Sequence, residues 1–120
     1  MKYLMLIKAS EKFEMKDIPQ ALFDAMDKHV AAGFKSGVLK DTAGLKRTSE
    51  GFRVRQSQGK ITVTDGPFTE AKEVVGGYAL LEVASREEAL KEAKAFMDLH
   101  LKNWPAFEGE CEVREVAPME

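Results

Sequence analysis

The sequence predicts a single α+β domain, residues 1–120, in which two strand–helix–strand units flank a β-hairpin. Three observations support this prediction. Two long segments carry apolar residues at the spacing of an amphipathic helix, and six short segments have the apolar or alternating pattern of strands. Breaks that contain glycine or proline separate these segments. The resulting order is the split βαβ pattern of a ferredoxin-like domain with an inserted hairpin.

The first unit begins with Tyr3–Lys8, an apolar run that is too short for a stable helix and is typical of a central strand. Pro19 is a suitable first-turn residue for a helix that runs to about Lys35. The helix carries one apolar stripe, formed by Leu22, Phe23, Met26, Val30, Gly33 and Phe34. Ser36-Gly37 ends this helix, and residues 38–45 form the second strand.

A β-hairpin follows. Residues 52–56 and 61–64 alternate between apolar and polar, and Gln58-Gly59 between them is a suitable turn. Gly76-Gly77 then opens the next strand, Tyr78–Val83.

The second unit closes with a helix and an edge strand. Ser85 and Glu88 form a capping box at the start of the helix, and Pro105 enforces its end. Residues 111–115 alternate in the manner of a final strand at the sheet edge. Cys111 lies in that alternation, so it is interpreted as a small core residue rather than a reactive thiol. As the only cysteine, it excludes an internal disulfide and cannot build a zinc site alone.

The first strand indicates a homodimer. Two helices can cover only one face of the sheet. Yet Tyr3, Met5 and Ile7 alternate with Leu4 and Leu6, so both faces of this strand are apolar. The sheet of a second subunit is the simplest cover for the second face.

Composition excludes several classes of partner. The hydrophobic content of 44% and the charged content of 32% are those of an ordinary soluble protein. A net charge of -2 gives no electrostatic reason to expect nucleic acid or an anionic membrane as a partner. No apolar run approaches the ~20 residues of a membrane span. We therefore expect a cytoplasmic protein. Because nucleotide-binding, redox and serine-hydrolase motifs are missing from the sequence, no cofactor is expected.

The segment from Asp65 to Glu70 is the strongest candidate site. Gly66-Pro67 forces a turn directly after a strand, and carboxylates lie on both sides of it. Asp65 can be a backbone cap or a general base. The candidate substrate-binding residues are Arg53, Phe68, Glu70 and Tyr78. Asp65, Glu70 and Glu73 lack the spacing of a calcium loop, so no metal site is expected.

The chain has two histidines. His29 lies on the flank of the first helix stripe, where it can be a partly buried structural residue or a proton shuttle that Asp65 orients. His100 follows Phe96 by four residues near the end of the second helix, and it is interpreted as a structural or capping residue. Trp104 is expected to close the core or the dimer rim, with ligand stacking as the alternative.

The ordered motifs resemble the YCII-related proteins that carry the Asp-Gly-Pro-Phe motif. The residues that carry the resemblance are Met1–Ile7, Gly37–Leu39, Gly44-Leu45, Arg53–Arg55, Asp65–Phe68, Glu70, Lys72-Glu73, Gly77-Tyr78 and Glu112–Arg114. The resemblance implies a ferredoxin-like fold that pairs into a dimeric α+β barrel. It also implies a candidate pairing of a helix-one histidine, here His29, with an aspartate.

Two functions remain open from the sequence. The first is a small enzyme in which Asp65, with His29, moves protons on a small organic substrate in the dimer cleft. This resembles the isomerases and dehydrohalogenases among related α+β barrel proteins. The second is a non-catalytic ligand-binding or accessory module, because the resemblance implies an association with extracytoplasmic-function sigma factors and stress signalling.

Overall fold

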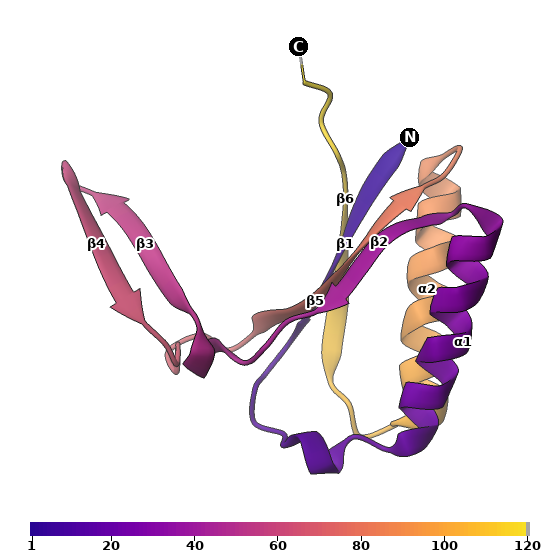
Figure 1. The fold of residues 1–120 in the computed structure, drawn as a ribbon, viewed down its shortest axis with the longest axis horizontal. Coiled ribbons are helices and arrows are strands. Elements are labelled where there is room, and N and C mark those ends of the chain that lie inside the picture. The colour runs from indigo at the N-terminus through magenta and orange to yellow at the C-terminus, as the bar shows by residue number, and fades with distance from the viewer. Residues whose placement is uncertain (120) are drawn as a thin grey trace.

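The fold is an antiparallel four-stranded sheet with two helices, from which a separate β-hairpin extends (Figure 1). The computed structural model describes residues 1–119. The elements are β1 (Lys2–Ala9), α1 (Gln20–Ser36), β2 (Leu39–Gly44), β3 (Phe52–Ser57), β4 (Lys60–Asp65), β5 (Val74–Glu82), α2 (Arg86–Asn103) and β6 (Gly109–Glu115), with short 3-10 turns η1 (Met15–Asp17) and η2 (Thr48–Glu50). The strand order is β2-β5-β1-β6, with β3 and β4 paired on their own. The predicted ferredoxin-like α+β fold is confirmed, with β1 in the sheet centre and β6 at its edge.

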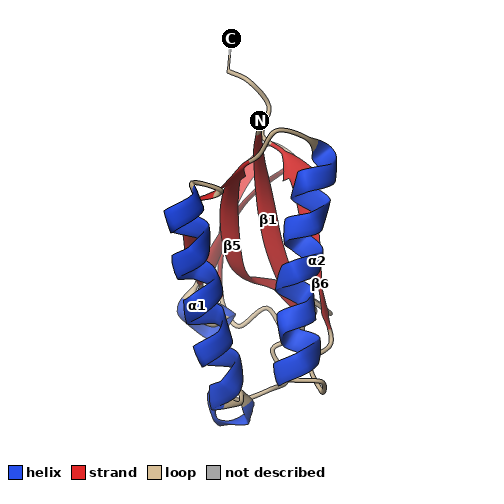
Figure 2. Ribbon diagram, turned by 90° about the vertical axis from the view of Figure 1, so that its right-hand side faces the viewer, coloured by secondary structure: helices blue, strands red, loops and turns tan. Residues whose placement is uncertain are grey.

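Both helices pack on one face of the sheet (Figure 2). Successive side chains of a strand point to opposite faces, so alternate residues of β1 face the helices. Tyr3 and Met5 are 6% and 3% exposed there. The rest of the buried cluster is Leu39, Leu81, Val83, Ala89 and Ala93. This core positions the two helices over the sheet.

The opposite face of the sheet is open within the described chain (Figures 1 and 2). Leu4 pairs with Leu80 across β1 and β5, and Leu6 pairs with Tyr78. These four residues therefore form an apolar strip on the face away from the helices, which we call the open face. At the edge of that face, Lys8 forms ion pairs with Glu110 (3.0 Å) and Glu112 (2.9 Å).

The helix ends follow the local sequence signals. Pro19 precedes the first residue of α1, and Gly37 ends the helix with a φ of 85°. At α2, Ser85 Oγ accepts a hydrogen bond from the Glu88 backbone N–H (3.2 Å). Glu88 Oε2 in turn accepts from the Ala84 backbone N–H (3.0 Å), so the capping interaction reaches one residue further back than predicted.

Two details differ from the sequence-based expectation. Strand β5 begins at Val74 rather than Tyr78, so Gly76 and Gly77 lie inside the strand. At Gly77 a Cβ would lie 3.1 Å from the Ala43 carbonyl oxygen, so the glycine permits close pairing with β2. Phe34 is 48% exposed instead of buried. At that end of α1 the glycine at position 33 faces the sheet and lies against Leu39, which turns Phe34 outward.

The hairpin β3–β4, residues 52–65, extends on the side of the sheet opposite the helices (Figure 1). We call it the arm. Gln58 and Gly59 form its turn, with φ values of 51° and 75° that match a type I′ turn and the right-handed twist of the strands. Every residue of both arm strands is exposed. No helix described in residues 1–119 is long and apolar enough to cross a membrane.

Candidate functional site

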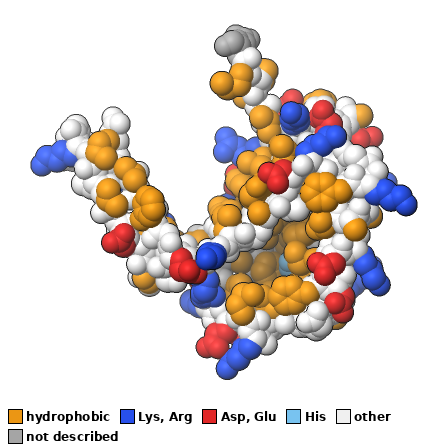
Figure 3. Space-filling view, in the orientation of Figure 1, with side chains coloured by type: hydrophobic (Ala, Val, Ile, Leu, Met, Phe, Trp, Pro, Cys, Tyr) orange, Lys and Arg blue, Asp and Glu red, His pale blue; other side chains and the backbone are white. Residues whose placement is uncertain are grey.

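A cavity of about 320 Å³ lies between the helix layer and the sheet. Its lining is mostly apolar and comes from every layer of the fold: Met5 and Ile7 from β1, Leu22 and Met26 from α1, Ala79 from β5, and Phe96 from α2. Figure 3 shows it as a hollow bordered by hydrophobic side chains, with histidine atoms in its depth. The volume lies at the lower end of the range of small-molecule sites.

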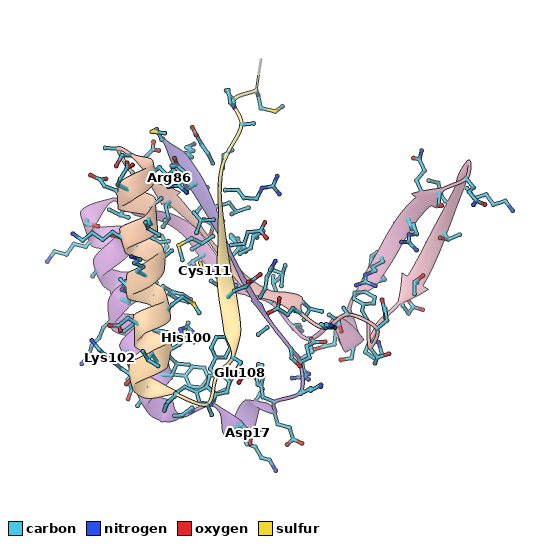
Figure 4. All side chains as sticks on the ribbon, turned by 180° about the vertical axis from the view of Figure 1, so that it is seen from behind. Asp17, Arg86, His100, Lys102, Glu108 and Cys111 are labelled. Carbon is cyan, nitrogen blue, oxygen red and sulfur yellow. The ribbon has the colours of Figure 1, made fainter. Side chains whose placement is uncertain are left out.

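His100 is the one buried polar side chain described in residues 1–119, at 6% exposure, and it lines this cavity. Its Nδ1 lies 3.0 Å from the Phe96 carbonyl oxygen. Because a carbonyl can only accept, Nδ1 carries the hydrogen, and the neutral ring then has a lone pair at Nε2. Nε2 is therefore the ring nitrogen of His100 that can accept a hydrogen bond. Figure 4 labels His100 near the C-terminal end of α2.

Aromatic rings surround His100 and form one wall of the cavity. The rings of Phe96 and Phe107 each lie 4.8 Å from the imidazole, between centroids. Trp104 lies 5.1 Å from Phe107 and meets Phe13 edge-on at 5.2 Å. The linker after β1 supplies Phe13, and α2 and the linker after it supply the other three rings. We call Phe13, Phe96, Trp104 and Phe107 the aromatic wall.

A hydrogen-bonded cluster holds the mouth of the cavity. The Arg47 guanidinium donates to the Phe13 carbonyl (2.9 Å) and to the Glu11 carbonyl. The Thr48 backbone N–H and hydroxyl donate to the Glu11 carboxylate, at 2.8 and 2.5 Å. Burial acts to raise the pKa of Glu11, but the Thr48 hydrogen bonds and the Arg47 charge outweigh it and hold the pKa below its usual value. The cluster thereby ties the linker after β1 to the segment before the arm.

The Asp-Gly-Pro-Phe turn joins the same cluster. The Phe68 backbone N–H donates to the Thr48 hydroxyl (3.2 Å), and the Gly66 N–H donates to the Gly51 carbonyl (2.9 Å). A Cβ at Gly66 would lie 1.6 Å from the Thr48 carbonyl oxygen, so only glycine fits there. We call Glu11, Arg47, Thr48, Gly66 and Phe68 the latch.

Three of the predicted site residues lie together at the base of the arm. The Arg53 guanidinium carbon is 3.7 Å from the centre of the Phe68 ring, and the same guanidinium forms an ion pair with Glu70. The backbone N–H of Glu70 and the Arg53 hydrogen bond lower the pKa of Glu70. Phe68 and Glu70 line an open crevice of about 870 Å³ that has a mixed polar lining. The crevice shares Glu11 and Arg47 with the mouth of the apolar cavity.

The other predicted residues lie elsewhere. Asp65 is the last residue of β4, opposite Phe52, and it lines neither the apolar cavity nor the crevice. His29 lies on α1, 6.2 Å from the Phe96 ring, and lines a separate cavity of about 40 Å³. Tyr78 of β5 borders the apolar cavity, and its hydroxyl donates to Asp41 (2.9 Å), a hydrogen bond that raises the pKa of Tyr78. The structure thus does not bring Asp65 and His29 to a common cavity.

Sequence reasoning did not find the aromatic wall, and it interpreted His100 as a structural or capping residue without placing it at a cavity. The available signal was the four-residue spacing from Phe96 to His100, which puts a polar residue on an apolar helix face. Cys111 fits its sequence interpretation, because partial burial raises the pKa of its thiol to about 11. A thiol with that pKa is almost entirely protonated at neutral pH and is a poor nucleophile.

Comparison with known proteins places the chain in a family. The model of the YCII-related domain matches residues 1–120. An uncharacterised protein of Rhizobium meliloti is 37% identical over 83 residues, which make up 69% of this chain and 63% of that protein. The match therefore spans less than two thirds of that relative's length. The chain belongs to the YCII-related family.

Proposed function

We propose that the protein takes a small, largely apolar organic molecule into the cavity between helices and sheet and transfers a proton at His100. The observation that carries this proposal is the buried His100, whose Nδ1 is held by the Phe96 carbonyl while Nε2 stays available in an apolar cavity. A concave apolar site with one fixed polar group is the usual design of a small-molecule site. The rings of the aromatic wall suit a planar, unsaturated ligand.

The chemistry follows from the hydrogen bond at Nδ1. Histidine can gain and lose a proton near neutral pH. When Nε2 takes a proton from a substrate carbon or hydroxyl, the positive charge that forms on the ring is stabilised by the Phe96 carbonyl at Nδ1. Isomerisation and dehydrohalogenation both begin with such a proton removal. This assignment replaces the proposed pair of Asp65 and His29 with a single base inside the cavity.

A non-catalytic binding role, in the stress or sigma-factor context that the sequence motifs imply, is the second candidate. One observation favours it: Glu11 is the only acidic side chain among the described residues that line the cavity, and both of its carboxylate oxygens are bonded to Thr48. Both oxygens of this carboxylate are thus already bonded, which makes Glu11 a poor second proton carrier.

We also propose that the protein acts in the cytoplasm as a homodimer. The open face supports the homodimer, because Leu4, Leu6 and Leu80 have no described helix over them. A second copy that covers the face would give the dimeric α+β barrel that the sequence motifs imply. The cavity lies on the other side of the sheet, so dimerisation leaves it accessible.

The test pairs two variants with a screen of small aromatic compounds. Ligands are found by thermal shift, and turnover is then followed for His100→Phe and Asp65→Asn. His100→Phe keeps a ring in the wall but removes Nε2, so we expect a loss of ~10²–10⁴-fold in rate. Asp65→Asn should keep normal activity per folded molecule.

Three results are informative. Loss of turnover in Asp65→Asn with normal turnover in His100→Phe would contradict the proposal and support a carboxylate base in the turn. Saturable binding without turnover for every ligand would support the binding module. Equal turnover of a ligand by the wild type and by both variants would show that neither His100 nor Asp65 transfers the proton.

A further inference from the structure

The arm is exposed on both of its faces. Its strands pair only with each other, and no residue of either strand is buried. A two-stranded hairpin by itself is at best marginally stable in water, because it has no core to pack against. The arm is nevertheless long, with six residues in each strand. A further surface is therefore needed to stabilise it.

One face of the arm is largely apolar, with Gln56 near the turn and Asp65 at the base as its polar members. The pairs Val54–Val63 and Gln56–Ile61 and the residue Phe52 place four large hydrophobic side chains on the same side of the ribbon. Phe52, Val54, Ile61 and Val63 are 60–67% exposed. Figure 3 shows hydrophobic side chains running along the arm. The other face carries Arg53, Arg55, Lys60, Thr62 and Thr64, the composition of a face in water.

The base of the arm prevents it from folding back onto its own sheet. Gly66 is bonded to Gly51 across the base and abuts Thr48. Phe68 is bonded to the Thr48 hydroxyl, and its ring is covered by the Arg53 guanidinium. These contacts fix the direction of the arm, and its apolar face is exposed in the single chain.

The geometry selects a second copy of this chain as the partner of the arm. The arm and the open face lie on the same side of the sheet and enclose an angle (Figure 1). A second copy seated in this angle would cover both surfaces at once, and two-fold symmetry would repeat each contact. A partner that covered the arm alone would leave the strip of Leu4, Leu6 and Leu80 in water.

The area is also sufficient. Four side chains of this size, about two-thirds exposed, present on the order of 400 Å² of apolar surface, within the range that marks interaction sites. Each docked arm buries its own face and a similar area on the partner. Two arms then bury roughly 1,600 Å², which is the standard size of a specific interface.

We propose that the arm is a clasp that packs its apolar face, Phe52, Val54, Ile61 and Val63, against a second copy of the chain. This inference rests on the proposed homodimer and goes beyond it, since it assigns part of the interface to the arm. It does not involve the ligand cavity.

The test compares two charge substitutions on the same strand. Val63→Glu lies on the apolar face and should weaken dimerisation at least ~100-fold, because one unpaired carboxylate would be buried at each contact. Thr62→Glu is the matched control, one residue away on the polar face, and should leave the dimer constant within ~3-fold. Both are measured by sedimentation and light scattering from 1 to 100 µM, with circular dichroism to confirm the fold.

Hydrogen exchange of the wild-type protein gives a second measurement that needs no variant. We expect the arm amides to be protected at 100 µM and to lose protection on dilution, because a hairpin without a partner opens readily. That result supports the clasp even if Val63→Glu fails to fold. If Val63→Glu leaves the dimer intact, the clasp is contradicted while the homodimer still stands. A monomeric wild type would overturn the clasp and the homodimer together, whether or not the arm then binds vesicles or another protein.

Discussion

Gly66→Ala is expected to destabilise the protein by about 3 kcal/mol, while Gly51→Ala should change stability by less than about 0.5 kcal/mol. The two glycines face the same atom. A Cβ at position 66 would lie 1.6 Å from the Thr48 carbonyl oxygen, whereas a Cβ at position 51 would lie 3.6 Å from it, at ordinary contact distance. Relief of the first contact requires the latch to move. The expected cost therefore comes from steric overlap.

Steric overlap, rather than a positive φ, makes glycine necessary at position 66. The described glycines with positive φ are Gly37 and Gly59. Urea unfolding of both variants at equal protein concentration checks the prediction. Equal midpoints for Gly66→Ala and the parent would show that the turn does not sit against Thr48.

Met5→Lys and Leu4→Lys are expected to fail in different ways although the residues are neighbours on β1. Met5 is 3% exposed and faces the helices, so a lysine there buries an unpaired charge at a cost of several kcal/mol. Leu4 lies on the open face, paired with Leu80 and Arg114. A lysine there is solvated in the monomer, and a second subunit would bury its charge, so the larger cost falls on dimerisation.

The expected results are an insoluble or largely unfolded Met5→Lys protein and a folded, monomeric Leu4→Lys protein. Thermal melting and light scattering separate the two outcomes. A Leu4→Lys protein with the mass and melting temperature of the parent would show that this side chain is not covered by a second subunit. A stable Met5→Lys protein would contradict the assignment of the helix-facing core.

Most of the fold could be predicted because its signals are local. The capping of α2 by Ser85, the end of α1 at Gly37 and the arm turn at Gln58-Gly59 depend on residues within a few positions of one another. The start of β5 was misplaced for the opposite reason. Glycines usually interrupt strands, and only the approach of β2 to Gly77 explains why the strand continues through them.

The candidate site was harder to predict because it forms between distant segments. Phe13 and Trp104 are in contact although both long helices and four strands separate them in the chain. No periodicity reports such a contact, since the linkers that carry these rings have no repeating pattern. The turn that contains Asp65 has an unusual sequence, which predicts a functional site. In the structure, its residues join the base of the arm to Gly51 and Thr48.

The surroundings of His100 also depend on distant segments. A histidine on the apolar face of a helix is predicted to be buried, and it is. Whether its surroundings are filled or hollow depends on side chains from α1, β1 and β5, which the helix sequence does not report. Whether this histidine borders a cavity therefore could not be predicted from the helix sequence alone.

The most direct test of the central claim is nitrogen NMR of the two imidazole rings, with and without a bound aromatic ligand. The chain has two histidines, His29 and His100, so the signals that disappear in His29→Gln belong to His29 and the remaining ones to His100. We predict that neutral His100 carries its hydrogen on Nδ1, and that saturating ligand shifts its Nε2 signal while the His29 signals stay in place. A hydrogen on Nε2, or a saturating ligand that leaves His100 unshifted, would contradict the assignment of His100 as the proton-transferring group of the cavity.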